Sequence, residues 1–182
     1  MGTSFTRMDE STEAQWHHIA EQHFIHQERI ADRMLWMLQS LSEITAGCPC
    51  DQLTHCLQTA TLAERAGADD EVVFASLLHD VGKAVSVDNH GPIAAEMIRP
   101  FVREDVYQMI RVHQDFQGRH YYQYLGKDPQ ARERHRSELT PEQFALAARF
   151  ADEWDQVAFD DQYDTLPLSH FEPLIRRLTT TS

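Results

Sequence analysis

The chain has 182 residues, of which 42% are hydrophobic and 25% charged, which is ordinary for a globular protein and enough for one domain with a sizeable core. Its 16 basic and 29 acidic residues give a net charge of −13, a field that repels nucleic acids, so we expect no nucleic-acid partner. No apolar run approaches the roughly 18 residues of a membrane-spanning helix, and the N-terminus lacks an apolar signal core. We therefore expect a cytoplasmic protein without a membrane partner.

The first part of the chain is predicted to be a flexible end followed by a long helix. Residues 1–11 are polar, which is typical of a loose terminus. From about residue 11 to 41 apolar side chains recur at gaps of three and four, which predicts one helix with a buried face, capped by Ser11 or Thr12. We expect Trp16 and Trp36 to anchor this helix in the core.

Histidines and cysteines in the first third of the chain raise the question of a second metal site. The predicted first helix carries His17, His18, His23 and His26. Such histidines could bind a metal, but a solvated helix face is the better interpretation. The chain has three cysteines, Cys48, Cys50 and Cys56. An odd number argues against a disulfide framework, and Cys-x-Cys is shorter than the usual zinc spacing, so we expect reduced thiols.

Two capped helices are predicted next. Asp51 is a good N-cap for a helix to about residue 66, on which His55, Gln58 and Thr59 share a face by their spacing and are expected to point into one site. Asp69 or Asp70 caps a third helix of almost wholly apolar sequence.

The third helix is predicted to end at the adjacent pair His79–Asp80. Gly82 then lets the chain turn, which brings Lys83 within reach of the same cavity. His90 is expected in a loop, ahead of a fourth helix that begins near Pro92.

The second half of the chain is also predicted to be helical. A fifth helix over about 104–114 presents His113, and a sixth opens with Thr140 as N-cap and Pro141 at its first position. A short helix over about 171–178 closes the chain. Residues 116–139 mix aromatic and charged side chains, and we interpret them as a pocket rim or lid followed by a solvated stretch.

The pair His79–Asp80 is the strongest chemical signal. An apolar approach buries the pair in a dry site, where a metal ion would compensate the buried charge. Further candidates occur in the order H…HD…H…H…D: His55, His79, Asp80, His90, His113 and Asp155, with Asp152 as an alternative to Asp155. Six such ligands exceed the needs of one four-coordinate ion and suit two ions that share Asp80.

These motifs resemble those of the HD-domain superfamily. The matching segments are His55-Cys56-Leu57-Gln58-Thr59-Ala60, Leu77-Leu78-His79-Asp80-Val81-Gly82-Lys83, Asn89-His90-Gly91 and Ile110-Arg111-Val112-His113. The resemblance covers about residues 50–175 and implies an all-α fold, a single HD-domain helical bundle over residues 12–182. The superfamily contains metal-dependent phosphohydrolases and a smaller branch of di-iron oxygenases, which includes phosphonate-cleaving enzymes and is related to myo-inositol oxygenase.

Chain length, the lone domain and the six-ligand pattern resemble the oxygenase branch. The resemblance implies that His55, His79, Asp80 and Asp155 hold one iron and that Asp80, His90 and His113 hold the other. The pattern around Trp154-Asp155-Gln156 favours Asp155 over Asp152 as the last ligand. The expected cofactor is an Fe(II)/Fe(III) pair, and the expected reaction uses O2 to cleave a C–P or C–C bond in a small hydroxylated, anionic substrate.

Some positions depart from the phosphonate oxygenases. Their tyrosine and glutamate before the first ligand are missing from residues 44–51, Lys83 replaces a histidine, and a lysine after the second histidine is replaced near Gln117 or Arg119. The substrate therefore stays open. Candidate substrate contacts are Gln58, Lys83 and Arg119, and Lys83 is also the candidate catalytic residue.

The alternative function is an HD phosphohydrolase that acts on a small phosphate ester or nucleotide. It would use Mn, Co, Ni or Mg in place of iron, with the metals generating hydroxide and binding the phosphoryl oxygens. A binding protein that keeps the fold without turnover is a third reading, disfavoured because all six ligand types are present. The sequence leaves the choice between monomer and homodimer open.

Overall fold

The structure, a computed structural model, describes residues 4–180, and over that range it contains helices and no strand. The all-α prediction is thus confirmed. None of the helices in this range is both long and apolar enough to cross a bilayer. The α-helices are α1 (Glu13–Gln27), α2 (Ile30–Ser40), α3 (Gln52–Arg65), α4 (Asp70–Leu78), α5 (His90–Ile98), α6 (Glu104–Gln117), α7 (Pro141–Arg149) and α8 (Leu168–Thr179).

Shorter helical segments connect these elements. The 3-10 helices are η1 (Met8–Glu10), η2 (Leu41–Glu43), η3 (Val81–Ala84), η4 (Arg99–Phe101), η5 (Gly118–His120), η6 (Tyr122–Leu125) and η7 (Ala131–Ser137), and a π-helix, η8 (Phe150–Asp155), follows α7 directly. Of the N-terminal residues 1–11, which we expected to be flexible, residues 1–3 lie outside the described range and η1 occupies part of the rest.

Polar residues cap four of the helices at the positions that the sequence predicted. The side chains of Thr12, Asp51, Asp69 and Thr140 each accept a hydrogen bond from a backbone N–H in the first turn of their helix. Such a bond satisfies a donor that has no partner inside the helix. Local sequence therefore determines where these helices begin.

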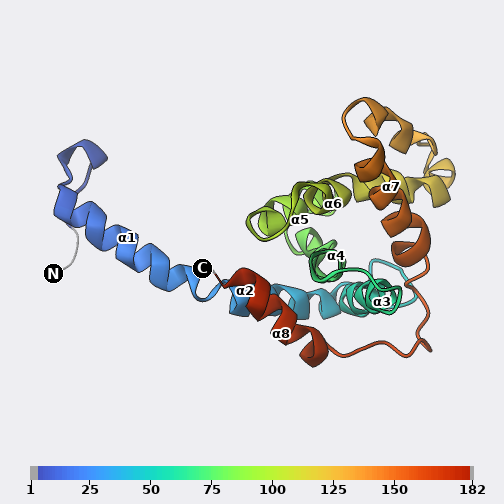
Figure 1. Ribbon diagram of the computed structural model, residues 1–182, viewed down its shortest axis with the longest axis horizontal. Helices are drawn as coiled ribbons and strands as arrows, with labels where there is room; N and C mark the ends of the chain where they lie inside the picture. Colours follow the sequence, from blue (N-terminus) through green and yellow to red (C-terminus); the bar gives the residue numbers. More distant parts are fainter. Residues whose placement is uncertain (1–3, 181–182) are drawn as a thin grey trace.

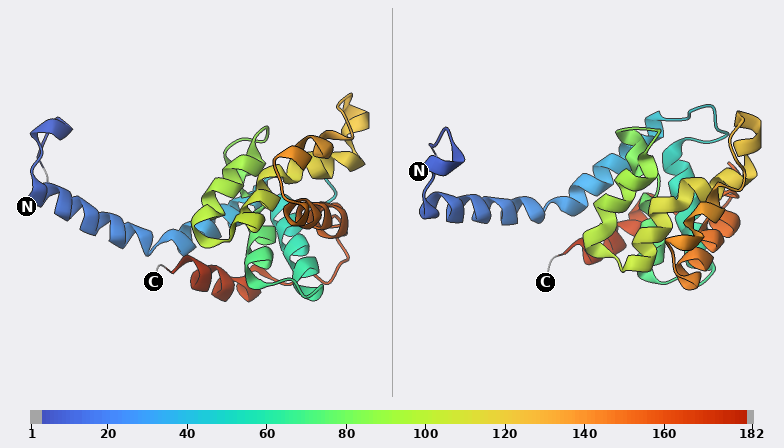
Figure 2. Two further views of the ribbon diagram at one scale, coloured as in Figure 1. Left: turned by 45° about the horizontal axis from the view of Figure 1, so that its top comes forward. Right: turned by 90° about the horizontal axis from the view of Figure 1, so that it is seen from above.

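The predicted single helix over 11–41 is wrong, because the structure divides it into α1 and α2 at Glu28–Arg29. Helix α1 has no buried residue and extends away from the rest of the molecule, as Figures 1 and 2 both show. Trp16 and Trp36 are 42% and 68% exposed, so they are not core anchors. Trp16 lies on the projecting helix, and Trp36 is two residues from Met34, on the side of α2 opposite to its buried face.

The remaining helices pack into one body with one large apolar core and a second, smaller apolar cluster. Helix α3 packs against α4, α5 against α6, and α6 against α7, while α8 lies across α2 and α4 (Figure 1). The largest fully buried side chains include four phenylalanines, Phe74, Phe116, Phe150 and Phe171. Helix α4 is at the centre, and every residue from Val72 to Leu78 is buried. A helix that is apolar on all sides requires neighbours all round.

His90, a predicted metal ligand in the connection between α4 and α5, does not lie where we expected it. We expected His90 in a loop, but it is the first residue of α5, two positions before Pro92. A close backbone approach accompanies this arrangement: a Cβ at Gly82 would lie 2.2 Å from the backbone oxygen of His90. Gly82 therefore does more than permit a turn, because only the absence of a side chain lets η3 lie against the start of α5.

Candidate metal centre

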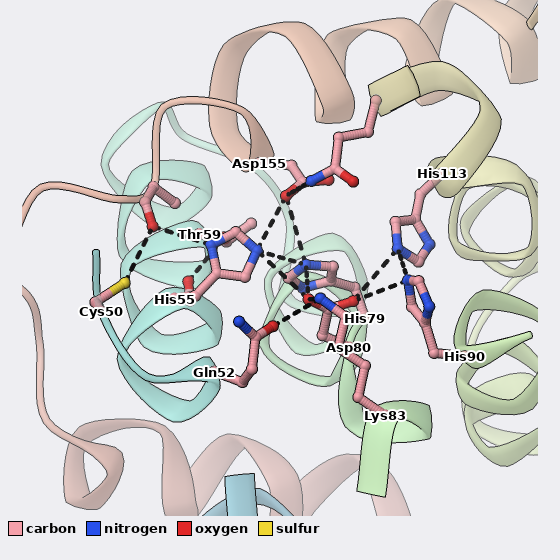
Figure 3. Close-up of polar contacts among 12 residues, drawn as sticks. Cys50, Gln52, His55, Thr59, His79, Asp80, Lys83, His90, His113 and Asp155 are labelled. Atoms are coloured by element: carbon pink, nitrogen blue, oxygen red, sulfur yellow. Dashed lines mark hydrogen bonds and ion pairs between the residues drawn. The ribbon is translucent and has the colours of Figure 1, made fainter. Parts of the chain in front are cut away.

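Six side chains from five helical segments converge in the middle of the body (Figure 3). They are His55 on α3, His79 and Asp80 just after α4, His90 at the start of α5, His113 on α6 and Asp155 at the end of η8. All six residues are buried, and the most exposed, His90, is only 4% exposed. The structure thus brings together the six residues that the sequence pattern singled out, from positions 100 residues apart.

One half of the cluster is built around His55 and His79. Their Nε2 atoms are 3.1 Å apart, and His55 Nε2 lies 3.1 Å from Asp155 Oδ1. The Oδ2 atom of Asp80 is 3.6 Å from His55 Nε2 and 3.5 Å from His79 Nε2. Two imidazoles and two carboxylates therefore present ligand atoms to one small volume.

The other half is built around His90 and His113. Their Nε2 atoms are 3.2 Å apart. The second oxygen of Asp80, Oδ1, lies 3.1 Å from His90 Nε2 and 3.6 Å from His113 Nε2. Asp80 therefore stands between the two halves, with one carboxylate oxygen toward each pair of histidines.

A backbone carbonyl fixes the orientation of each of the four imidazoles. The Nδ1 atoms of His55, His79, His90 and His113 lie 2.9, 2.8, 2.7 and 2.7 Å from the carbonyl oxygens of Ala158, Ser76, Val87 and Ile110. A carbonyl only accepts hydrogen bonds, so Nδ1 carries the proton and Nε2 of the neutral ring keeps a lone pair. This is the orientation that metal-binding histidines show.

The cluster has more acceptors than donors. With Nδ1 protonated, the paired Nε2 atoms direct lone pairs at one another at hydrogen-bond distance. In addition, Asp80 Oδ1 and Asp155 Oδ2 are fully buried and have no hydrogen-bond partner among residues 4–180. Buried polar atoms nearly always have partners, and lone pairs that face one another repel unless a cation lies between them. The residues present therefore fit metal ions, and these buried His/Asp groups can bind one.

The pKa shifts in the cluster also favour metal binding, because metal ligands must be deprotonated. Burial alone would raise the pKa of Asp80 and Asp155, but the positive charge of a neighbouring histidine in its protonated form outweighs burial, so the pKa of each carboxyl lies below its ordinary value. Burial lowers the pKa of His113, which favours the neutral, ligand form of its ring. For His55, burial would lower the pKa, but the nearby Asp155 and Asp80 outweigh it and raise the pKa, so a proton competes with a metal at this ring.

Asp152 and Asp155, the two candidates for the last ligand, both lie on the π-helix η8 but contact different residues. Asp155 is buried in the cluster, and Gln117 Nε2 donates to its Oδ1 at 3.0 Å. Asp152 instead accepts hydrogen bonds from Arg132, at 3.0 Å, and from the ring of His120, at 3.0 Å. Among the two, Asp155 is the one that shares the site with the histidines.

A lysine and a glutamine adjoin the His55 half of the cluster. The ammonium of Lys83 contacts Asp80 Oδ2 and donates to Gln52 Oε1 at 2.6 Å. Burial would lower the pKa of Lys83, but Asp80 outweighs it and raises the pKa, so the side chain is a cation. Lys83 therefore lies where we expected it, beside the cluster.

The two other predicted substrate contacts lie elsewhere. The amide of Gln58 is held at both ends by the backbone of Asp160, with Nε2 donating to the carbonyl at 2.7 Å and the N–H donating to Oε1 at 3.1 Å. Thr59 Oγ1 donates to the His55 carbonyl. The side chain of Arg119 is half exposed and its nearest carboxylate is that of Asp152. Gln58 thus fixes a loop, and the expected substrate roles of Gln58 and Arg119 find no support in this arrangement.

Three neighbours of the cluster had no clear signal in the sequence. Gln52 is 1% exposed and contacts Lys83, Gln117 contacts Asp155, and the ring of Phe159 stacks on His55 with centroids 4.4 Å apart. Near them, burial and the charges of Asp155 and Asp80 raise the pKa of Tyr121 to about 12. Helical periodicity places Gln52 on the same face as His55, three residues away, and Gln117 lies near the position where the related oxygenases carry a lysine, but neither signal predicted these contacts.

The cysteines and the histidines of α1, which were the other candidates for a metal site, do not join the cluster. Within the described part of the chain, the groups of three or more metal-binding side chains are His55–His79–Asp155 and His79–Asp80–His113, and neither includes a cysteine or a histidine of α1. Cys56 is buried, whereas Cys48 and Cys50 are partly exposed, and all three are free thiols.

Comparison with known proteins agrees with this geometry. The HD domain family model matches residues 53–160, which is more than half of the chain and includes all six cluster residues. A search among curated proteins finds no match. The matched segment, the helical fold and the buried His/Asp pair at its centre lead to one conclusion: the chain belongs to the HD domain family.

Proposed function

We propose that this chain is a non-haem di-iron oxygenase that uses O2 to cleave a C–P or C–C bond in a small hydroxylated, anionic substrate. One observation carries the proposal: Asp80 directs Oδ2 toward the His55–His79 pair and Oδ1 toward the His90–His113 pair. A carboxylate in that position can bridge two ions, in the manner of two-metal enzymes whose ions are about 3.5–4 Å apart.

The donor set supports iron over magnesium. Four imidazole nitrogens face the two volumes, together with the two carboxylates of Asp80 and Asp155. Imidazole suits iron and other transition metals, whereas magnesium prefers an all-oxygen octahedron. In the proposal His55, His79, Asp80 and Asp155 hold one ion, and Asp80, His90 and His113 hold the second. When bound, the iron pair supplies the one-electron and O2 chemistry that no side chain provides.

The protein's own groups have three tasks in this proposal. The four backbone carbonyls keep each imidazole in the ligand tautomer, so the ring does not reorganise when a metal enters. Burial of the cluster among Phe150, Phe159 and their neighbours excludes water, which protects an oxidised substrate from side reactions. Lys83 places a positive charge beside Asp80, where it can attract an anionic substrate.

Metal analysis and an oxygen-uptake assay test the proposal. We expect protein from iron-supplemented cells to contain about two irons per chain and, after mild ascorbate reduction, a coupled S = 1/2 electron paramagnetic resonance signal below g = 2. Candidate hydroxylated phosphonates and polyols are then screened for O2 uptake. The matched hydrolase assay uses a generic aryl phosphate with Mn, Co or Ni under nitrogen.

The oxygen-uptake and aryl-phosphate assays distinguish the oxygenase from the alternative, an HD phosphohydrolase. Oxygen-independent hydrolysis of the aryl phosphate, with Mn, Co, Ni or Mg bound and no coupled iron signal, would replace the oxygenase by an HD phosphohydrolase. Absence of any tightly bound metal would contradict both functions.

A further inference from the structure

Helix α1 has an apolar side that the body of the molecule does not bury. The helix leaves the body at the start of α2, and none of its residues is buried (Figures 1 and 2). Its 15 residues are close to the length at which an isolated helix is only marginally stable in water. By their spacing Trp16, Ile19, Ala20 and Phe24 share one side of this helix, and Phe24 is 74% exposed.

An apolar groove begins where α1 ends. It has a volume of about 460 Å³, and its apolar lining comes from Ile30, Met34 and Met37 on α2 together with Met97 and Phe101. Methionine side chains adapt to apolar partners of different shapes and are frequent at protein-binding surfaces. The α1 of the same chain extends away from the body and leaves this groove open (Figure 1).

The charges on α1 and beside the groove are opposite. Glu13 and Glu21 are exposed on α1, and their nearest basic groups are histidine rings of the same helix, at 3.7 and 3.9 Å. Arg29 and Arg33 are exposed next to the groove, and neither forms an ion pair with a carboxylate of residues 4–180. The two surfaces are therefore complementary, although whole chains of net charge −13 repel one another.

Antiparallel contact between two copies of the chain would use both surfaces. The acidic α1 of each copy then lies over the groove and the arginines of the other, whereas a parallel pair would place like charges together. Such a twofold interface uses the same surfaces on both chains. The 15 residues of α1 and the residues that line the groove together reach the roughly 20–30 residues per side of a stable interface.

We propose that α1 is a docking arm for a second copy of this chain: in an antiparallel dimer, the apolar side of each α1 fills the groove beside α2 of the other copy. The dimer supplies the packing that α1 lacks within its own chain. The inference does not depend on the proposed function, because no residue of α1 or of the groove belongs to the metal-binding cluster.

Sedimentation equilibrium of the full-length, metal-loaded protein tests the arm. We expect the wild type to have twice the mass of the chain. Trp16→Glu places a charge in the apolar contact of both arms, so the dissociation constant of the dimer should rise about 100-fold or more. Tyr124→Glu makes a similar exchange of an aromatic ring for a carboxylate on η6, at a position that is 81% exposed, and should dimerise like the wild type. Metal content should be the same in all three proteins.

Mixing two variants tests whether the arm occupies the groove. Met97→Glu places a charge in the groove and leaves the arm intact, so it should also be monomeric on its own. In an equal mixture, the arm of the Met97→Glu chain can still fill the groove of the Trp16→Glu chain. We therefore expect the two variants to bind each other at least about tenfold more tightly than either binds itself. Met37→Glu, on α2, repeats this test if Met97→Glu alters the metal content.

Three results would overturn the proposal. One is a wild-type chain that stays monomeric at its highest soluble concentration, which would leave α1 to a partner of another kind. Another is a Trp16→Glu protein that dimerises as tightly as Tyr124→Glu, because the interface would then lie elsewhere. The third is a mixture of the arm and groove variants that forms no heterodimer, because arm and groove would then not be each other's partners.

Discussion

Two sets of four histidines occupy opposite environments in this molecule. His17, His18, His23 and His26 are exposed on α1, the helix that projects from the body. His55, His79, His90 and His113 are buried, and each has Nδ1 near a backbone carbonyl and Nε2 toward a neighbour's Nε2. The closest carboxylates of the first set, at 3.7 and 3.9 Å, are exposed glutamates on the same helix.

The comparison teaches that the number and spacing of histidines do not make a metal site. A helix can bring side chains three or four residues apart onto one face, but on an exposed helix the imidazole rings stay accessible to water. In the cluster the fold has removed that access, because a carbonyl holds one nitrogen and burial leaves the other without water. If this difference in environment decides metal binding, changes to the buried set and to the exposed set must have unequal effects.

The largest effect is expected when a histidine is removed from the buried set. His79→Ala deletes the ring between the two groups of metal-binding side chains, and we expect the tightly bound metal to fall below about a tenth of the wild-type amount. Elemental analysis after dialysis against a weak chelator measures it. His23→Ala is the matched control in the exposed set. Retention of both metal and activity by His79→Ala would refute the metal-centred interpretation.

A backbone change that displaces the cluster should have the next largest effect. Gly82→Ala places a Cβ 2.2 Å from the carbonyl oxygen of His90, so η3 and the start of α5 must separate. We expect a loss of about 3 kcal/mol in the free energy of unfolding, measured by urea denaturation of the metal-free protein, together with weaker metal binding.

Val85→Ala is the control for this change, since that side chain is 68% exposed near the same turn and should alter stability by no more than about 0.5 kcal/mol. A Gly82→Ala protein as stable as the control would mean that the two segments are not held at this distance.

The smallest effect is expected when the exposed set is removed. Replacing His17, His18, His23 and His26 together by Gln should leave the metal content unchanged and should alter the free energy of unfolding by about 0.5 kcal/mol or less per position. The same elemental analysis and urea denaturation measure both quantities. Loss of a metal equivalent in this variant would show that α1 binds a metal after all.

Much of the helical structure could be predicted from the sequence because short stretches of residues determine where the helices begin and which are buried. The caps Thr12, Asp51, Asp69 and Thr140 have side chains that bond the first turn of a helix, and this preference is visible in the residue type itself. The almost wholly apolar stretch from Val72 to Leu78 in α4 likewise predicted a buried helix that ends at a dry site. The break between α1 and α2 was not predictable, because neither Gly nor Pro marks Glu28–Arg29.

The histidines and aspartates of the candidate site were predicted better than its glutamines. Six buried His and Asp residues in one order require a common cause, and a shared metal is the simplest one. A glutamine carries no such information: Gln58 and Gln52 both lie on α3, yet one bonds to a distant loop and the other to Lys83. Those partners are separated from α3 in sequence, so only the assembled fold decides between them.

The π-helix η8 makes the length of one segment as important as its composition. Gln156 N–H bonds to the carbonyl of Ala151, five residues back, so this turn holds one residue more than an α-helical turn. Deleting a single residue within 150–155 would restore α-helical pitch and rotate the following backbone by about 100°. Asp155, and the Ala158 carbonyl that orients His55, would both leave the centre. In diverging relatives, substitutions should accumulate in this segment long before a gap does.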